Sequence, residues 1–190
     1  MRIGICTNVG ADTETEYGEY FSWGDTIGRN KNGTVSHPYP FSKLNYNAGA
    51  SGSGHNLTGD FTQGDSNYDA ARANMGEPYM MPTEDQCNEL INNTDHEWTS
   101  INGVNGRKFI NKTDSSKYIF LPTGGLWYHD YPRLEHVDVG EYGQFWTTIF
   151  DKDLDYRAVT LMISSSNPYT TVTERQWGIS VHAIAPARPW

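Results

Sequence analysis

The run FWTTIFDKDLDYRAVTLMI, from Phe145 to Ile163, gives the clearest indication of how this chain folds. Two segments rich in aromatic and β-branched residues flank a charged insert, and segments of this composition favour β-strands. The insert carries Asp151, Asp153 and Asp155 in a D-x-D-x-D pattern. It could be a calcium loop, a cluster of catalytic acids, or a recognition loop on a rigid frame.

Strand patterns continue on both sides of this run. The segments EWTSI, RKFIN and YIFLP come before it, GISVHAI follows it, and residues 2–7 form another candidate strand. The sequence NGVNG between two of these segments is typical of a tight hairpin turn. We therefore expect several short strands joined mostly by turns.

Two short helices are predicted between the first strand and the later ones. In SNYDAARANMG, Ser66 can cap the first turn with Asp69 three residues later, and Gly76 suits the position just after the end. In PTEDQCNELINN, Thr83 is the cap and Gln86 completes a capping box. Apolar residues at spacings of three and four predict a face that packs on a sheet, formed by Cys87, Leu90 and Ile91.

The order of these elements predicts an α+β fold with an antiparallel sheet. The length of 190 residues suits one domain, which we place over residues 1–190. Residues 26–65 are rich in Gly, Asn, Ser and Pro and form a long, loop-rich excursion. Four large apolar side chains are expected to pin it to the body, namely Tyr39, Phe41, Leu44 and Tyr46.

Composition and charge exclude several classes of protein. The net charge of −9 comes from 23 acidic residues against 14 Lys and Arg, whereas nucleic-acid binding needs a basic face. No apolar run reaches the roughly 20 residues of a membrane-spanning helix, and MRIGICTNVGA is too short and interrupted for a signal peptide. The two cysteines, Cys6 and Cys87, are expected to be buried, reduced thiols.

Three blocks of sequence carry a resemblance to a known family. The first is CTNVGADTETEYGEYFSWGD, and the second is DAARANMGEPYMMPTEDQCNEL with EWTSINGVNGRKF and YIFLPTGGLW. The third is VGEYGQFWTT followed by RQWGISVHAI. In order and spacing these blocks resemble the FISUMP domain, a large paralogous group of bacterial surface-type and phage proteins. The likeness extends over almost the whole chain, with Tyr79, Met80 and His182 as departures from the family pattern.

The resemblance implies a specific frame. The FISUMP family is similar to the formylglycine-generating-enzyme branch of the C-type lectin fold, which implies a compact, C-type-lectin-like α+β domain with two helices and a twisted antiparallel core. The same branch includes the variable proteins of diversity-generating retroelements. Those proteins carry a tolerant ligand-binding surface near the C-terminus, so the resemblance implies such a surface here.

The residues disfavour a calcium site in the charged insert. Counted from Asp151, an EF-type loop needs Gly at position six and Glu at position twelve, but Tyr156 and Met162 stand there. The sugar-binding motifs E-P-N and W-N-D of C-type lectins are also absent from the sequence. We expect no metal and no cofactor, and we interpret the insert as a solvated acidic loop.

Enzyme chemistry is the main alternative to binding. The oxidase activity of the resembling branch is not expected, because its cysteines lie in the C-terminal half and none follows Cys87 here. The six histidines form neither an H-x-x-x-H nor an H-E-x-x-H pattern. Glycan hydrolysis needs two carboxyl groups about 5–10 Å apart, and its candidate acids are Asp130, Glu135, Asp151 and Asp155.

The tryptophans divide into two groups. Core positions are expected for Trp98, Trp146 and Trp177, with Trp23 as a further packing residue. Trp127 differs, because it stands in GGLWYHDYPRLEHVD, where aromatic and charged residues mix without periodicity. With Tyr128, His129 and Tyr131 it forms either an aromatic contact patch or a cover over the core.

Three segments correspond to the contact surface of the resembling variable proteins, and we expect them to converge on one face. They are residues 127–131, the insert 151–156 and the loop 169–176, which is rich in the residues of binding loops. No catalytic residue is assigned. The residues assigned to ligand binding are Trp127, Tyr128, His129, Tyr131, Asp151, Lys152, Leu154, Tyr156, Tyr169, Thr171, Arg175 and Gln176.

Together these observations favour a non-enzymatic ligand-binding module of the surface, adhesin or phage receptor-binding type. The resemblance adds the option that the module is a variable protein of a diversity-generating retroelement. Its expected partner is a cell-surface protein or a glycan, with no nucleic acid, no membrane insertion, and self-association as an open option. Its expected location is an extracellular surface or a virion. The alternatives are a glycan-active enzyme of the same fold and a structural subunit of a virion or fibre.

Overall fold

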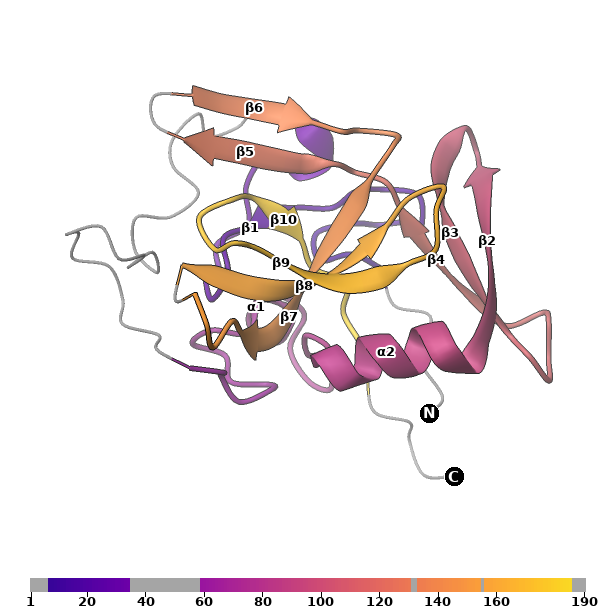
Figure 1. Ribbon diagram of the computed structural model, residues 1–190, viewed down its shortest axis with the longest axis horizontal. Helices are drawn as coiled ribbons and strands as arrows, with labels where there is room; N and C mark the ends of the chain where they lie inside the picture. The colour runs from indigo at the N-terminus through magenta and orange to yellow at the C-terminus, as the bar shows by residue number, and fades with distance from the viewer. Residues whose placement is uncertain (1–6, 35–58, 131–132, 155, 186–190) are drawn as a thin grey trace.

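The structure is a computed structural model that describes residues 7–34, 59–130, 133–154 and 156–185 (Figure 1). The elements in chain order are β1 (Tyr20–Phe21), the 3-10 helix η1 (Lys31–Gly33), α1 (Ala70–Met75), α2 (Glu84–Asn93), β2 (Thr94–Ile101), β3 (Val104–Asn111), β4 (Tyr118–Pro122), β5 (Leu126–Asp130), β6 (Arg133–Val137), β7 (Gly143–Phe150), β8 (Arg157–Ile163), β9 (Tyr169–Glu174) and β10 (Ile179–Ser180). No helix in these ranges is long and apolar enough to cross a membrane.

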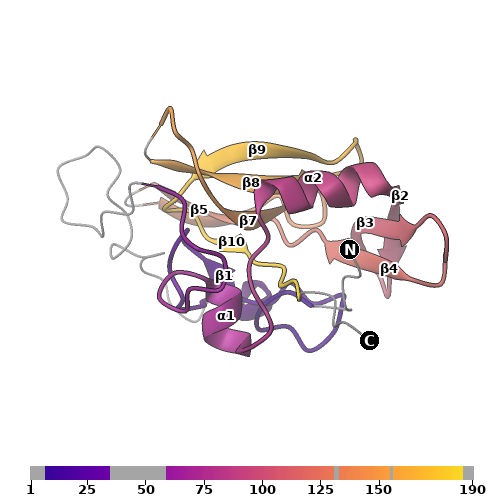
Figure 2. The same cartoon turned by 90° about the horizontal axis from the view of Figure 1, so that it is seen from below.

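The strands form three sheets, and the chain is an α+β protein, as the order of its elements predicts. The largest sheet has the order β1-β10-β7-β8-β9, in which only β10 and β7 run parallel. A second sheet has the order β2-β3-β4, and β5 and β6 form a separate hairpin. In Figure 1, α2 and the β5–β6 hairpin lie at opposite edges of the view with β8 and β9 between them, and Figure 2 shows α2 beside β7 and β8.

The run Phe145 to Ile163 forms most of β7, all of β8 and their connection, which confirms the two strands predicted around the insert. Trp146 is fully buried, and its indole N–H donates to the Phe21 carbonyl at 2.7 Å. Trp23 is also fully buried and donates to the Thr147 carbonyl at 2.8 Å. These bonds tie the N-terminal segment to the central strand, and they confirm the core positions of both tryptophans.

The other strand predictions have mixed outcomes. The core position is wrong for Trp98, which is half-buried because β2 is the edge strand of its sheet. Trp177 is also half-buried, although it packs against the core. The hairpin predicted in NGVNG is confirmed, with Asn102 and Gly103 at φ 51° and 81° between β2 and β3.

The second predicted helix is confirmed together with its capping box. The Thr83 hydroxyl accepts from the Gln86 N–H, and the Gln86 side chain accepts from the Thr83 N–H. Its apolar face, Cys87, Leu90 and Ile91, packs against side chains of β3, β4, β7 and β8. The helix is therefore fixed on the sheets by the face that its spacing predicts.

The first helix is shorter than predicted, because Asp69 rather than Ser66 is its cap. The Asp69 side chain is fully buried and accepts from the Arg72 N–H at 3.0 Å and from the Met81 N–H at 3.0 and 3.1 Å. One carboxylate thus caps the helix and holds the segment before α2, a role that the exposed Ser66 cannot fill. Gly76 ends the helix as predicted, with φ 72°.

Two segments predicted as loops are strands. Residues 126–130 pair with residues 133–137 as the β5–β6 hairpin, and residues 169–174 pair with β8 as β9. The first segment mixes polar and apolar residues without the alternation that usually indicates a strand. The second is rich in Tyr, Thr and Val, which favour strands.

Several predictions fall outside the described ranges. They concern Cys6, all but the last residue of the candidate strand 2–7, and the four apolar residues Tyr39, Phe41, Leu44 and Tyr46. At the described end of the excursion, Phe61 is buried, and its ring lies 5.1 Å from that of Trp23. Cys87 is a buried free thiol.

Candidate functional site

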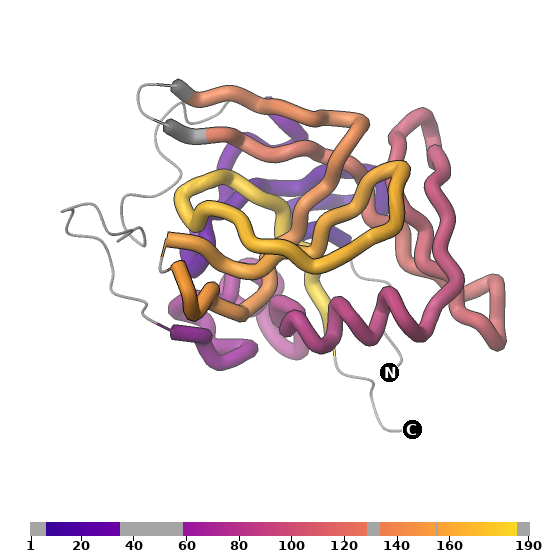
Figure 3. The backbone as a smooth tube through the Cα atoms, viewed as in Figure 1, coloured from indigo at the N-terminus to yellow at the C-terminus, as the bar shows by residue number. Residues whose placement is uncertain are grey.

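Parts of the three predicted contact segments meet around the turn that joins β9 to β10 (Figure 3). On one side of this turn, Gly178 exchanges two backbone hydrogen bonds with Trp127, at 2.8 and 2.9 Å. On the other side, the Arg175 N–H donates to the Tyr156 carbonyl at 2.9 Å. The turn therefore lies between β5 and the β7–β8 insert and is bonded to both.

Trp127 supports this end of the molecule from inside. Its side chain is 4% exposed and stacks on His136 with ring centroids 4.6 Å apart, while Tyr20 meets it edge-on at 6.5 Å. The His136 Nε2 atom lies 2.8 Å from the Gly124 carbonyl, and burial lowers the pKa of this histidine. Of the two interpretations of Trp127, the geometry fits a cover over the core.

Arg175 is the second buried support. Its side chain is 2% exposed, and its guanidinium lies 4.8 Å from the Trp23 ring and 5.5 Å from the Phe150 ring. Its carbonyl accepts from the Trp23 N–H at 2.9 Å. An arginine in this position stabilises the turn through packing and cation–π attraction, and its side chain is buried rather than presented at the surface.

The accessible side chains at this end form a mixed aromatic and polar group, which we call the contact face. It consists of Tyr128, Lys152, Leu154, Tyr156, Gln176 and Trp177. The Tyr128 and Trp177 rings lie 5.0 Å apart, and the Gln176 amide donates to the Glu174 carboxylate at 2.9 Å. The sequence predicts a core position for Trp177. No local pattern in the sequence indicates that the neighbouring Gly178 pairs with β5, which brings Trp177 beside Tyr128.

The insert is a locally closed turn. The Asp151 side chain accepts from the Asp153 N–H at 3.0 Å, and the Leu154 carbonyl accepts from the Arg157 N–H at 2.9 Å. The Arg157 guanidinium lies 5.1 Å from the Tyr156 ring. Within the described residues, no three His, Cys, Asp or Glu side chains are placed to share a metal ion.

Not every predicted contact residue lies at the contact face. Tyr169 is at the other end of β9, where it pairs with Met162, and a six-residue strand spans about 17 Å. Thr171 lies in the middle of the same strand. Nothing is described of Tyr131 or of the His129 side chain.

The candidate acids for glycan hydrolysis are only partly described. Glu135 is exposed on β6, opposite Tyr128 in the register, and Asp151 is half-buried in the insert. The side chains of Asp130 and Asp155 lie outside the described ranges. Hydrolysis by these acids stays a prediction.

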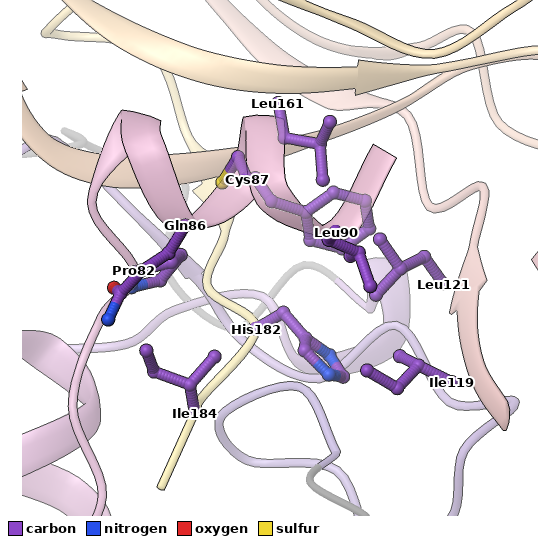
Figure 4. Close-up of a pocket in the computed structure, with 10 residues that line it drawn as sticks. Pro82, Gln86, Cys87, Leu90, Ile119, Leu121, Leu161, His182 and Ile184 are labelled. Carbon is purple, nitrogen blue, oxygen red and sulfur yellow. The ribbon is translucent and has the colours of Figure 1, made fainter. Parts of the chain in front are cut away.

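An apolar cavity of about 30 Å³ lies beside α2, and the side chains that line it include Cys87 and His182 (Figure 4). The Asn8 side-chain oxygen lies 2.9 Å from His182 Nδ1, and the Asn8 amide nitrogen donates to the Tyr17 carbonyl, so the imidazole proton sits on Nδ1. Burial lowers the pKa of His182 to about 4 and raises that of Cys87 to about 12. A neutral imidazole and a protonated thiol do not form an activated nucleophile.

Comparison of the chain with protein-family models, with curated proteins and with solved structures found no match. The contact face and its buried supports are therefore interpreted from their own geometry.

Proposed function

We propose that this chain is a non-enzymatic ligand-binding module that engages a cell-surface protein or a glycan through the contact face. The observation that carries the proposal is the position of the β9–β10 turn, whose backbone is bonded to Trp127 on one side and Tyr156 on the other. Segments far apart in the sequence are thereby held on one end of the molecule. Binding residues are disproportionately found on loops that a rigid scaffold positions in this way.

The chemistry of the contact face supports recognition. Tyr128, Tyr156 and Trp177 offer aromatic surface, and Lys152 and Gln176 add a charge and an amide. Aromatic side chains supply large contact area at low entropic cost and dominate many interfaces. The buried Trp127 and Arg175 keep the turn in place, so the exposed Lys152 and Leu154 can differ without loss of the frame.

The proposal includes a C-type-lectin-like frame. Its support is the combination of two helices with antiparallel sheets, and the pairing of segments from both ends of the described chain, where the Val9 N–H donates to the Val181 carbonyl at 2.9 Å. The adhesin, phage or retroelement role, with a location on an extracellular surface or a virion, rests on the family resemblance. A near-copy of the terminal coding DNA that differs only at adenines, beside a reverse-transcriptase gene, would establish the retroelement role.

The test is a triple variant, Tyr128→Ala, Tyr156→Ala and Gln176→Ala, assayed on immobilised glycans and extracellular protein domains. We expect the triple variant to lose binding to every ligand that the wild-type chain binds. The melting temperature should fall modestly, because all three side chains are partly exposed and Tyr128 also packs against the core. Arg175 is left unchanged, because it is buried and its loss would destabilise the frame. The matched control is Tyr142→Ala, an exposed tyrosine before β7.

Retention of binding by the folded triple variant would place the site elsewhere on the molecule. Turnover of a glycan by the wild-type chain would favour the enzyme hypothesis instead. An effect of Tyr142→Ala equal to that of the triple variant would mean that the assay reports general surface changes.

A further inference from the structure

The outer edge of β9 is an unprotected strand edge. β9 ends the order β1-β10-β7-β8-β9 and pairs only with β8 in the described part of the chain. Two large apolar side chains on it reach solvent, Tyr169 at 50% and Val172 at 38% exposure. The opposite edge of the sheet is closed, because β1 has two buried residues and Tyr20 exchanges backbone hydrogen bonds with Arg29.

The hydrogen-bond phase of β9 determines which peptide groups point outward. The Arg175 N–H donates to the Tyr156 carbonyl. The peptide groups of every second residue before Arg175 therefore also point toward β8. Arg157, the register partner of Glu174, has both of its peptide groups bonded within the β7–β8 connection, which agrees with this phase. The peptide groups left facing outward belong to Thr170, Val172 and Glu174.

β9 lacks the features by which natural edges avoid pairing with other chains. Its sequence YTTVTE has one charge, no Lys and no Pro, and its register with β8 is unbroken. The β2 edge of the second sheet carries the exposed acids Asp95 and Glu97. Charge thus protects the β2 edge and leaves the β9 edge open.

We propose that two copies of this chain associate through their β9 edges as antiparallel strands, with Val172 on the twofold axis. In a symmetric antiparallel pair, directly opposed residues must have their side chains on the same side of the sheet. The axis therefore lies midway between the two copies of one residue, and not between two residues that are neighbours in sequence. With Val172 on the axis, its N–H donates to the carbonyl of Val172 of the partner subunit and the reverse. The Glu174 N–H then donates to the carbonyl of Thr170 of the partner subunit and the reverse. This gives four bonds in total, since the Glu174 carbonyl already accepts from the Trp177 N–H at 3.1 Å.

The charges of this edge permit a second copy but do not attract it. Glu174 is the only charged residue of β9, and Arg157 lies directly across from it on β8. Its counterpart across the axis, Thr170, is neutral, although the Thr170 hydroxyl donates to the Glu84 carboxylate at 2.9 Å. Because Glu174 approaches that carboxylate and each copy carries a net charge of −9, association should strengthen as salt screens the repulsion.

Sedimentation equilibrium on the whole chain tests the proposal, with Val172→Lys compared with Val139→Lys. Both valines are exposed, at 38% and 42%, and Val139 lies in the connection between β6 and β7 rather than on β9. We expect a wild-type dimer whose dissociation constant rises about tenfold or more in Val172→Lys, because two lysines then face each other across the axis. The Val139→Lys variant should dimerise like the wild type.

A cysteine at the axis checks the register. The Cα atoms of a directly opposed, hydrogen-bonded pair lie about 5.5 Å apart, which a disulfide can span. Val172→Cys should therefore form a covalent dimer under mild oxidation, and Val139→Cys should not. The proposal would be overturned if the wild-type chain stayed monomeric at millimolar concentration, even if its β9 edge bound a foreign extended peptide. It would also be overturned if Val172→Lys dimerised as tightly as the wild type.

Discussion

The β8–β9 hairpin is held by a buried arginine at each end, and the two ends are held differently. At the closed end, the turn of residues 164–168, Arg107 reaches in from β3 and its guanidinium donates to the carbonyls of Ser164 and Ser166. Its other terminal nitrogen lies 3.3 Å from His96 Nδ1 on β2. The turn is therefore bonded to a side chain of another sheet, in addition to its own bond from the Ser166 N–H to the Ser164 hydroxyl at 3.1 Å.

At the open end, the β7–β8 insert and the β9–β10 turn are held mainly by their own backbone. Arg175 belongs to the turn and stacks on Trp23 and Phe150, while its N–H and carbonyl are bonded to Tyr156 and Trp23. The exposed side chains of this end take no part in those bonds. A surface whose frame does not depend on its exposed residues can vary in sequence, which is what the proposed binding role requires.

The largest effect is expected from Arg107→Ala at the closed end. It leaves two carbonyls without their charged donor and should lower the free energy of unfolding by about 3 kcal/mol, measured by urea denaturation. Arg107→Lys should lie in between, because an ammonium cannot reproduce the planar fork of a guanidinium. A loss below about 1 kcal/mol for Arg107→Ala would mean that the turn holds its own shape.

A smaller effect is expected from Arg175→Ala at the open end, because the backbone bonds of the turn remain. The loss of the ring contacts and of the packed side chain should lower the free energy of unfolding by about 2 kcal/mol. Arg175→Met keeps most of the packing and should recover about half of that loss. If Arg175→Ala proves more destabilising than Arg107→Ala, the comparison between the two ends is reversed.

Local patterns in the sequence predict much of this fold and little of its assembly. The strands around the insert, the capping box at Thr83 and the turn at Asn102 and Gly103 all depend on residues a few positions apart, and all three are confirmed. The predicted cap of α1, Ser66, is wrong. The Asp69 side chain caps the helix instead, and it also accepts a hydrogen bond from the N–H of Met81, twelve residues away. Long-range partners of this kind leave no periodic signal.

The same limit applies to the candidate site. The sequence predicts which segments are polar and aromatic, and the structure bonds parts of all three around one turn. It does not predict that Trp127 and Arg175 turn inward or that Trp177 lies beside Tyr128. Side-chain direction at these positions follows from the pairing of Trp127 with Gly178, a contact across about 50 residues of chain.

Acidification should loosen the closed end and leave the Arg175 side of the open end unchanged. Burial lowers the pKa of His96, and the charge of Arg107 lowers it further, with a smaller effect of Lys112 in the same direction and an opposing effect of Asp95. Because the folded chain disfavours the protonated ring, this histidine contributes stability that is fully present above its unfolded pKa of about 6.5. That contribution is lost as the pH falls from about 6.5 through the lowered pKa of the folded chain.

Amide hydrogen exchange resolves this loss by position. As the pH falls from 7 to 5, amides of residues 164–167 should lose protection after correction for the intrinsic rate, because a second positive charge then lies beside Arg107. Amides of residues 175 and 176 should keep their protection, since the Trp23 and Phe150 rings beside Arg175 do not titrate. Residues 177 and 178 are left out of the comparison, because Trp127, the partner of Gly178, stacks on the titratable His136. His96→Gln should remove the pH dependence of the closed end. If both ends loosen equally in that variant, the effect comes instead from a global change, for which the buried His182 is the strongest source.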